Sequence, residues 1–376
     1  MEILSIKCRL ISSPFKGTKI HGQTHNLKTV AIIESKTEHH VGYGEAYVGI
    51  YIPEVTKLIT ESLEKYFINI EIEDAIKKIN SFNIPFAANA GVYRSIIGAI
   101  ETSMYDLQSR IDDLPLYKLF SEEIKIPNLY ASGGSVITNK SELDQDLQYA
   151  EKQGFDAFKM RVGKKSWEED VERVHHVKSK FNGRDIMVDS IYGTRKMKHK
   201  YEDQLEMYKQ LENFDLTWLE EPLPVDKISL HSSLKENLCI PLAAGEAYSS
   251  MAEFEALINI SDIDIVQFDV THSGGFSNCC EIYNMTINKN KKAAFHVWGS
   301  MVALLSNFHL AIGMKELYFF EVPLLELVFN EDILISEYKN LYDLFTKAPT
   351  EPGLGFVIPE EVFKKYEYVA GTEYKW

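Results

Sequence analysis

Three short runs decide the fold: Ile186-Met187-Val188-Asp189, Thr217-Trp218-Leu219-Glu220 and Pro241-Leu242-Ala243-Ala244-Gly245-Glu246. Each run is apolar and ends in an acidic residue, and each acid follows the previous one by a spacing that fits one strand-plus-helix unit. If the strands are parallel, their carboxyl ends meet at one mouth and bring the three carboxylates together. Crowded carboxylates repel unless a cation lies between them, and an all-oxygen site suits Mg²⁺. The sequence therefore predicts that Asp189, Glu220 and Glu246 bind Mg²⁺.

The same alternation of strand and helix begins near Ile126. Strands are predicted at Asn128–Ser132, Ala157–Val162, Asp185–Val188, Thr217–Leu219, Leu242–Gly245, Ile263–Phe268, Ala293–Val297 and Leu317–Phe320. Helices are predicted between them at Glu142–Lys152, Trp167–Lys180, Tyr201–Asn213, Met251–Ile258, Asn278–Asn288 and Val302–Ile312. Eight short apolar strands indicate an α/β fold with a (β/α)8-type barrel, a modified TIM barrel. The alternative is an open doubly wound sheet, but no Gly-x-Gly-x-x-Gly turn follows the first strand.

The amino-terminal part follows a different pattern. Strands at Ile3–Ile11, Thr29–Ser35 and Val41–Val48 predict an antiparallel meander, and helices follow at Glu54–Phe67 and Ala90–Ile111. We therefore expect an α+β capping domain over residues 1–122, the barrel over residues 123–337, and a segment over residues 338–376 that packs back on the capping domain.

The composition argues against several classes of function. The chain has 376 residues, is 45% hydrophobic and carries a formal net charge of −15 at pH 7. Nucleic acid and anionic membranes are not expected partners, because phosphate binding needs a basic face. There is no signal sequence at the amino terminus and no apolar run long enough to cross a bilayer, so a cytoplasmic protein is expected. The four cysteines fit neither a disulfide framework nor a zinc site and are expected to be reduced.

Two cations are predicted on the second barrel strand. Residues two apart on a strand share a face, so Lys159 and Arg161 should point inward together, toward the metal ligands of the next strand. Lys159 could donate to a substrate carboxylate and spread the charge of an enolate. Arg161 could clamp an anion but is a poor base. The alternative is that the pair only neutralises buried acids.

Strands six and seven end in Asp269 and His296, which are again separated by one strand-plus-helix unit. Asp269 could accept a hydrogen bond from one imidazole nitrogen and leave the other as a general base or acid. A histidine after an apolar pair is more often an ordinary core residue, but the aspartate one strand away favours the catalytic interpretation. His272 is assigned no role.

Strand eight ends at Glu321, for which two interpretations stay open. A protonated carboxyl group could donate a hydrogen bond to charge that develops on the substrate, or the carboxylate could be paired with a lysine at the rim. Glu221 points away from Glu220 by strand alternation and is interpreted as structural.

Together these residues resemble the enolase superfamily, mandelate racemase-like subgroup. The resemblance rests on Lys159-Met160-Arg161, Val188-Asp189, Trp218-Leu219-Glu220-Glu221-Pro222, Gly245-Glu246, Asp269 before Gly274-Gly275, His296 and Glu321, and on Gly42-Tyr43-Gly44-Glu45 and Pro115-Leu116-Tyr117-Lys118. It implies Mg²⁺ on the three acids, abstraction of the proton α to a carboxylate, a small-molecule carboxylate substrate and a homo-oligomer. It also implies that the loops Ser12–Asn26 and Tyr47–Pro53 close over the barrel and select the substrate.

Three positions refine the resemblance. The muconate-lactonizing subgroup has a lysine where this chain has Asp269, which favours mandelate racemase-like chemistry. Arg161 stands where that subgroup usually has the second lysine of a Lys-x-Lys pair, so two-faced proton transfer is less expected. Ile191 replaces a common asparagine, which puts contacts to the substrate hydroxyl in doubt.

The preferred reaction is Mg²⁺-dependent dehydration of an acid sugar, an aldonate or aldarate, to a 2-keto-3-deoxy acid, with His296 as the base. The alternatives are racemisation, epimerisation or cycloisomerisation of a related hydroxy acid or lactone, and a catalytically silent relative that only binds a metal or sugar acid.

Overall fold

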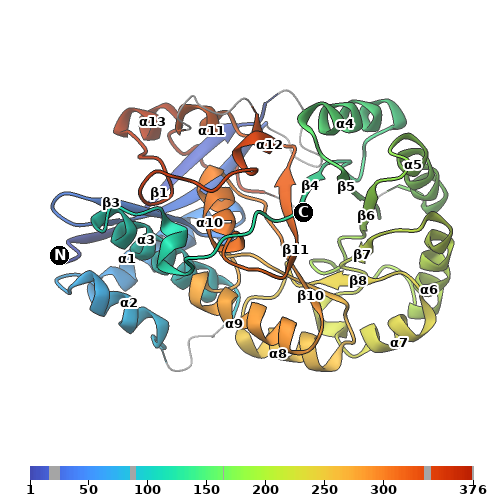
Figure 1. The fold of residues 1–376 in the computed structure, drawn as a ribbon, viewed down its shortest axis with the longest axis horizontal. Coiled ribbons are helices and arrows are strands. Elements are labelled where there is room, and N and C mark those ends of the chain that lie inside the picture. Colours follow the sequence, from blue (N-terminus) through green and yellow to red (C-terminus); the bar gives the residue numbers. More distant parts are fainter. Residues whose placement is uncertain (17–25, 85–89, 164, 334–339, 375–376) are drawn as a thin grey trace.

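Eight parallel strands form a closed barrel in the computed structural model, which describes residues 1–376 apart from 17–25, 85–89, 164, 334–339 and 375–376 (Figure 1). The strand order is β10-β11-β4-β5-β6-β7-β8-β9, with β10 paired to both β9 and β11. The strands are β4 (Leu129–Ser132), β5 (Ala157–Arg161), β6 (Asp185–Asp189), β7 (Trp218–Glu220), β8 (Leu242–Ala244), β9 (Ile265–Phe268), β10 (Lys292–Phe295) and β11 (Leu317–Pro323). The prediction of a closed barrel is confirmed, and the doubly wound sheet is excluded.

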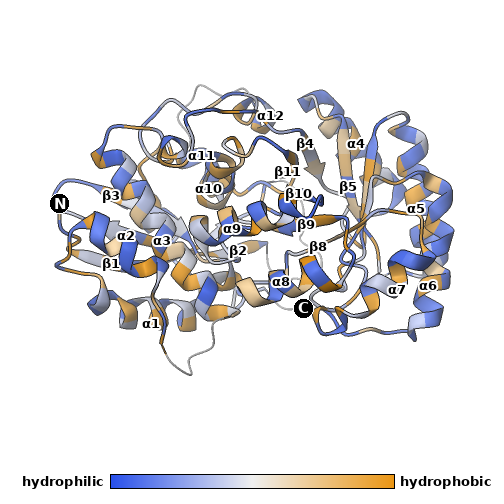
Figure 2. Ribbon diagram, turned by 60° about the horizontal axis from the view of Figure 1, so that its bottom comes forward, coloured by the Kyte–Doolittle hydropathy of each residue, from blue (hydrophilic) through white to orange (hydrophobic). Residues whose placement is uncertain are grey.

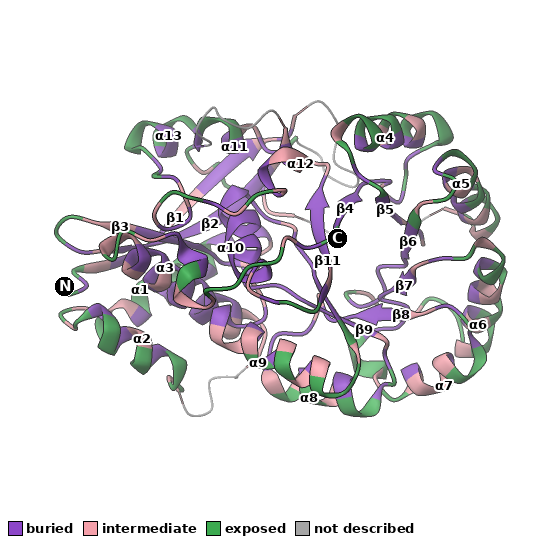
Figure 3. Cartoon of the chain, in the orientation of Figure 1, coloured by how far each residue is buried: buried purple, intermediate pink, exposed green. Residues whose placement is uncertain are grey.

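The inside of the barrel is filled by side chains. Large residues such as Trp218, Tyr130 and Phe319 pack there against small ones such as Ala243 and Ala294. The strands are buried along almost their whole length (Figure 3), since helices cover them outside and this cluster fills them inside. Figure 2 shows the same separation, with apolar strands and with polar residues on the outer helices. Because apolar side chains fill the inside of the barrel, the residues that could take part in catalysis lie at the carboxyl ends of the strands.

Helices connect the barrel strands, most of them as the sequence predicts. They are α4 (Lys140–Gln153), α5 (Trp167–Lys180), α6 (Tyr201–Lys209), η4 (Gln210–Phe214), η5 (Val225–Lys227), α7 (Leu230–Asn237), α8 (Met251–Ile260), α9 (Gly275–Asn288) and α10 (Met301–Ala311). Two further helices, α11 (Val328–Ile333) and α12 (Leu341–Leu344), follow the last barrel strand. Capping boxes at Asn139, Ser166 and Ser250 begin α4, α5 and α8. Helix α7 was not predicted, because it is short and buries only His231 and Leu234.

The amino-terminal part is an antiparallel sheet covered by helices. Its elements are β1 (Ser5–Pro14), β2 (Leu27–Lys36), β3 (Val41–Glu45), η1 (Tyr47–Ile50), α1 (Pro53–Leu63), η2 (Glu64–Tyr66), α2 (Ile72–Asn80), α3 (Val92–Ile111) and η3 (Leu116–Leu119). Strand β3 ends at Glu45 rather than at Val48, and α2 was missed. Gly44 allows α3 to pack closely on β3, since a Cβ at this position would lie 2.1 Å from the Ala99 carbonyl oxygen.

The last part of the chain contacts the first strand. Helix α13 (Glu360–Lys365) lies beside β1 in Figure 1. Arg9 forms an ion pair with Glu360 at 2.8 Å, and its guanidinium carbon lies 4.1 Å from the centre of the Phe363 ring. Among the described residues, no helix has both the length and the apolar character needed to span a membrane.

The interface between α3 and α9 contains a buried carboxylate, which leads to a prediction about pH. Glu101 accepts a hydrogen bond from the Ser277 backbone at 3.3 Å, and burial raises its pKa to about 7. Because this pKa lies above the value in the unfolded chain, the contribution to stability is full below about pH 4.5 and is lost as the pH rises through 7. The charged form therefore costs up to about 3 kcal/mol at pH 8.

Glu101→Gln should remove this cost. In urea unfolding the variant should be more stable than wild type at pH 8, by up to about 3 kcal/mol, and nearly equal at pH 4.5. The same change at exposed Glu73 on α2 serves as the control and should have no effect at either pH. A constant difference between Glu101→Gln and wild type across this range would contradict the assignment.

Candidate active site

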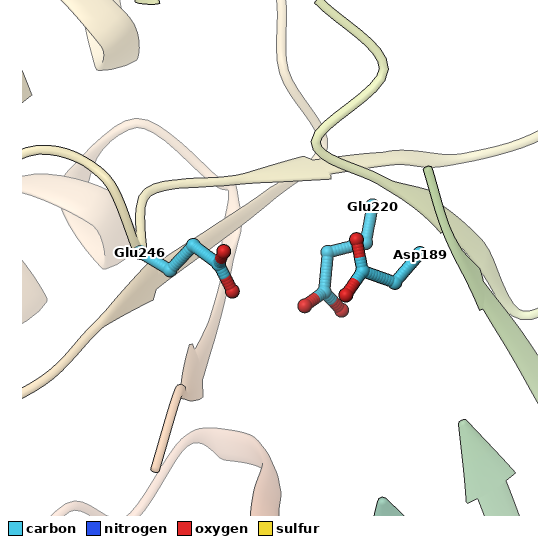
Figure 4. A group of neighbouring side chains, drawn as sticks. All are labelled: Asp189, Glu220 and Glu246. Atoms are coloured by element: carbon cyan, nitrogen blue, oxygen red, sulfur yellow. The ribbon is translucent and has the colours of Figure 1, made fainter. Parts of the chain in front are cut away.

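The three acidic residues converge at the mouth of the barrel. Asp189 ends β6, Glu220 ends β7 and Glu246 follows β8 by two residues. One carboxylate oxygen of each lies within 4.8 Å of those of the other two. Figure 4 shows the side chains of Asp189 and Glu220 next to each other, with Glu246 directed toward them from the neighbouring strand. The convergence predicted from strand ends is therefore present.

The charges in this cluster fit a divalent cation. Burial, together with the charges of Glu220 and Glu246, raises the pKa of Asp189 to about 8. Burial also raises the pKa of Glu246, and Glu220 adds to that shift. Asp189 and Glu220 are buried and Glu246 is half-buried, so the three carboxylates destabilise one another, and a cation between them would remove the repulsion. Their all-oxygen donor set suits a hard ion such as Mg²⁺.

Lys159 and Arg161 point toward the acids, as predicted. The Lys159 ammonium is fully buried and lies 2.5 Å from Glu220 and 2.9 Å from Glu321. Although burial lowers the pKa of Lys159, the charges of Glu220, Glu321 and Asp189 raise it above its usual value, so the amine stays charged. Arg161 lies 3.4 Å from Asp189 and donates to the Gly133 carbonyl and the Ser132 hydroxyl at 3.1 Å. Both cations are fixed beside the acidic cluster.

His296 and Asp269 form the predicted pair. The Nδ1 atom of His296 lies 3.0 Å from an Asp269 oxygen, and its Nε2 atom lies 3.4 Å from Glu246. The other Asp269 oxygen accepts from the Thr271 backbone, the Thr271 hydroxyl and the Asn307 amide, at 2.7–2.9 Å. Despite burial, which raises it, the pKa of Asp269 is lowered by His296 and these donors. Asp269 is therefore an ionised carboxylate that orients the imidazole.

The surroundings of Glu321 decide between its two interpretations. Burial raises the pKa of this carboxyl group, but the charges of Lys159, His296 and Arg161 lower it to about 2. Its second oxygen accepts from the Val297 backbone at 3.0 Å. The protonated donor considered from the sequence is not supported. The ion pair with Lys159 agrees with the paired carboxylate of the alternative interpretation, except that Glu321 is buried rather than exposed at the rim.

Ile191 and Glu221 have left-handed backbone conformations next to the metal candidates. Ile191 has φ of +53°, which is strained for a β-branched residue, and its backbone N–H donates to Asp189 at 2.7 Å. Its side chain is buried and apolar, so it cannot bind a substrate hydroxyl as asparagine would. Glu221, with φ of +45°, is buried and accepts from the Gly245 backbone at 2.7 Å, which agrees with a structural role.

A cavity of about 810 Å³ opens beside Glu246. The amino-terminal residues Tyr47 and Tyr51 line it together with Arg195 and His272 from the barrel loops. The Tyr47 ring lies 5.8 Å from the His296 ring, and its backbone N–H donates to the Thr271 carbonyl at 3.1 Å. The sequence pointed to the loop Tyr47–Pro53, but it did not single out these lining residues, since loop contacts have no periodic pattern. Much of the other loop, Ser12–Asn26, lies outside the described residues.

Comparisons with known proteins agree with this geometry. The family model described as "Enolase C-terminal domain-like" matches residues 142–362. The arabinonate dehydratase of Saccharolobus solfataricus is 27% identical over 357 residues, which cover 91% of each chain. The structure of 3,6-anhydro-D-galactonate cycloisomerase from Zobellia galactanivorans has a TM-score of 0.83 at 22% identity and covers 97% of this chain and 99% of its own. A Streptomyces coelicolor racemase with bound magnesium has a TM-score of 0.83 at 20% identity, with the same coverage. The two structures show that the fold is shared.

Proposed function

Because the chain belongs to the enolase C-terminal domain-like family, we propose that it is a Mg²⁺-dependent lyase that dehydrates an acid sugar, an aldonate or aldarate, to a 2-keto-3-deoxy acid. The similarity to an arabinonate dehydratase over 91% of the chain supports this reaction class. The observation that carries the proposal is the position of His296, whose Nδ1 is held by Asp269 while its Nε2 faces the carboxylate cluster.

The chain's own residues supply the proton transfers and hold the substrate. Asp269 accepts a hydrogen bond from the Nδ1–H of His296, which leaves Nε2 to take the α-proton of the substrate. Lys159 and Arg161 would bind the substrate carboxylate and stabilise the negative charge that grows on it. A divalent cation bound by Asp189, Glu220 and Glu246 would add Lewis-acid polarisation of that carboxylate.

Loss of the β-hydroxyl completes the reaction. The imidazolium formed at His296 can return its proton to the leaving hydroxyl group, so that one water molecule is released and an enol remains. The enol then tautomerises to the 2-keto-3-deoxy acid. One histidine is sufficient for both proton transfers if the α-proton and the β-hydroxyl group leave from the face of the substrate that His296 occupies.

The alternatives are racemisation, epimerisation or cycloisomerisation, and a silent binding relative. Proton transfer on both faces of the substrate needs a second base, and Arg161 holds its proton too tightly to act as one. The ion pair of Arg161 with Asp189 also favours the charged form. The similarity to a dehydratase, and Arg161 in the place of a lysine, both favour dehydration.

A panel of aldonates and aldarates, assayed with semicarbazide for keto acid with and without Mg²⁺, tests the proposed function. At least one acid should give a keto product only when Mg²⁺ is present. Return of both epimers with exchange of the α-hydrogen, and without keto acid, would overturn dehydration. Homo-oligomeric assembly is a further proposal from the family resemblance, which sedimentation would test.

Arg161→Lys should create a second proton acceptor. In D₂O this variant is expected to incorporate deuterium at the α-carbon of recovered substrate several times faster than wild type, because a lysine amine can lose its proton. Proton NMR of the recovered acid measures the exchange. Equal exchange in both proteins would show that residue 161 does not face the α-carbon.

A further inference from the structure

The carboxy-terminal segment reaches from α13 to the mouth of the barrel. The Thr372 hydroxyl lies 2.9 Å from the hydroxyl groups of both Ser12 and Thr29, on β1 and β2. Two residues further, the Tyr374 backbone N–H donates to the Ile50 carbonyl at 2.8 Å. The segment is therefore fixed at two points, one on the amino-terminal sheet and one on the loop that lines the cavity.

The Tyr374 ring packs against two aromatic side chains of the mouth. Its centre is 5.2 Å from the Trp298 ring and 6.0 Å from the Tyr51 ring, edge-on to both. Trp298 follows His296 by two residues, and Tyr51 lines the cavity. Edge-to-face contacts of this kind favour one orientation of the rings.

Charges at the mouth also act on Tyr374. Burial raises the pKa of its phenol, while the charges of Arg161 and Arg195 oppose that shift. Arg161 is the side chain that pairs with Asp189, and Arg195 lines the cavity. These charges act beside the ring contacts that Tyr374 makes with Trp298 and Tyr51.

The buried Lys28 holds Trp298, the residue against which Tyr374 packs. The Lys28 ammonium donates to the Trp298 carbonyl at 3.0 Å and lies 4.1 Å from the centre of the indole ring. Trp298 is therefore held by the end of β10 and by the amino-terminal sheet, and Tyr374 packs on a rigid surface. Residues from three distant parts of the chain, near 28, 51 and 374, meet around the end of β10.

We propose that Tyr374 is a positioning residue for substrate specificity: through its contact with Tyr51 it shapes the cavity that would take the part of the acid sugar extending away from the reacting carboxylate. The inference rests on the proposed function for the identity of the ligand. The cavity beside Glu246 is lined by Tyr51, and the Tyr374 ring packs against Tyr51, so a substrate that extends from the carboxylate cluster into this cavity would meet a wall that Tyr374 supports. The edge-to-face contact favours one orientation of the Tyr51 ring, which can cover a C–H face of the sugar.

The test compares Tyr374→Ala with Tyr368→Ala. Tyr368 lies on the same segment, but its hydroxyl bonds to Glu54 on the outer side of the amino-terminal part, so its loss should not affect the site. Tyr374→Ala should raise KM for the best acid sugar at least fivefold, change kcat less than threefold and alter the order of preference within the panel. Tyr374→Phe keeps the ring contacts and should restore most of the affinity.

Dissociation constants separate this inference from the proposed reaction. They are measured by calorimetry for the same acids on the Mg²⁺-loaded protein, which requires no turnover. If wild type binds an acid sugar without dehydrating it, the reaction is wrong, and a fivefold weaker constant in Tyr374→Ala still supports the role of Tyr374. Constants and preferences equal to those of Tyr368→Ala would overturn the inference. Failure of wild type to bind any of the acids would overturn both proposals.

Discussion

Replacing His296 with asparagine should lower kcat by a factor of about 10³, because the substitution removes the group that takes the α-proton. Binding of Mg²⁺ should stay within about threefold of wild type, since the three carboxylates remain. Keto-acid formation measures the first effect, and calorimetry with Mg²⁺ measures the second. Asparagine also keeps a polar group in place for Asp269, so the fold should survive.

His272→Asn is the matched control for this prediction. His272 lines the cavity beside Glu246, and its ring lies 5.3 Å from the Tyr47 ring, which is also next to His296. The backbone N–H of His272 donates to the Asp269 carbonyl at 3.0 Å, and this bond is kept in the variant. The change should lower kcat less than tenfold. A His296→Asn enzyme that retains all its turnover would instead favour a site in which His296 has no catalytic role.

Asp189→Asn should have opposite effects on the metal-free and the metal-loaded protein. Without metal the variant should be more stable than wild type at pH 7.5, by roughly 2–4 kcal/mol, because asparagine replaces a carboxyl group whose ionisation is opposed by burial and by the neighbouring carboxylates. The pKa of Asp189 is raised to about 8, so this gain should disappear near pH 4, where the carboxyl group is largely neutral in the folded protein at little cost. With Mg²⁺ at 100 times its dissociation constant, wild type should gain about 2.7 kcal/mol, and the variant almost nothing.

Asp185→Asn provides the comparison on the same strand. Asp185 begins β6 at the opposite end of the barrel and is exposed. Urea unfolding with and without Mg²⁺ should show wild-type behaviour for this variant. If Asp189→Asn keeps the Mg²⁺-dependent gain in stability, Asp189 is not a ligand.

The parts of the site that could be predicted from sequence lie at strand ends. A parallel barrel brings the carboxyl ends of its strands to one mouth, so the positions of Asp189, Glu220 and His296 follow once the strands are recognised. The period of two along β5 likewise predicted that Lys159 and Arg161 share a face. The positions of these residues follow from the local sequence pattern together with one rule of barrel topology.

Other features depend on contacts that no local pattern records. The charge state of Glu321 on β11 depends on Lys159 on β5, far away in the sequence, so the sequence left two interpretations open. Thr372 and Tyr374, late in the chain, contact Thr29 and Ile50, which come early in it. Helix α7 was missed because its apolar face is too small to give a clear period. The residues that line the cavity were therefore not predicted, although the carboxylates beside it were.

Diffraction from crystals soaked in Mn²⁺, which stands in for Mg²⁺ and scatters anomalously, is the most direct test of the site. A single anomalous peak should lie between the carboxylates of Asp189, Glu220 and Glu246, within about 2.0–2.3 Å of an oxygen from each. The His296 imidazole should face the open side of that ion. A peak at another position, or none at saturating Mn²⁺, would contradict the metal site on which the proposed chemistry depends.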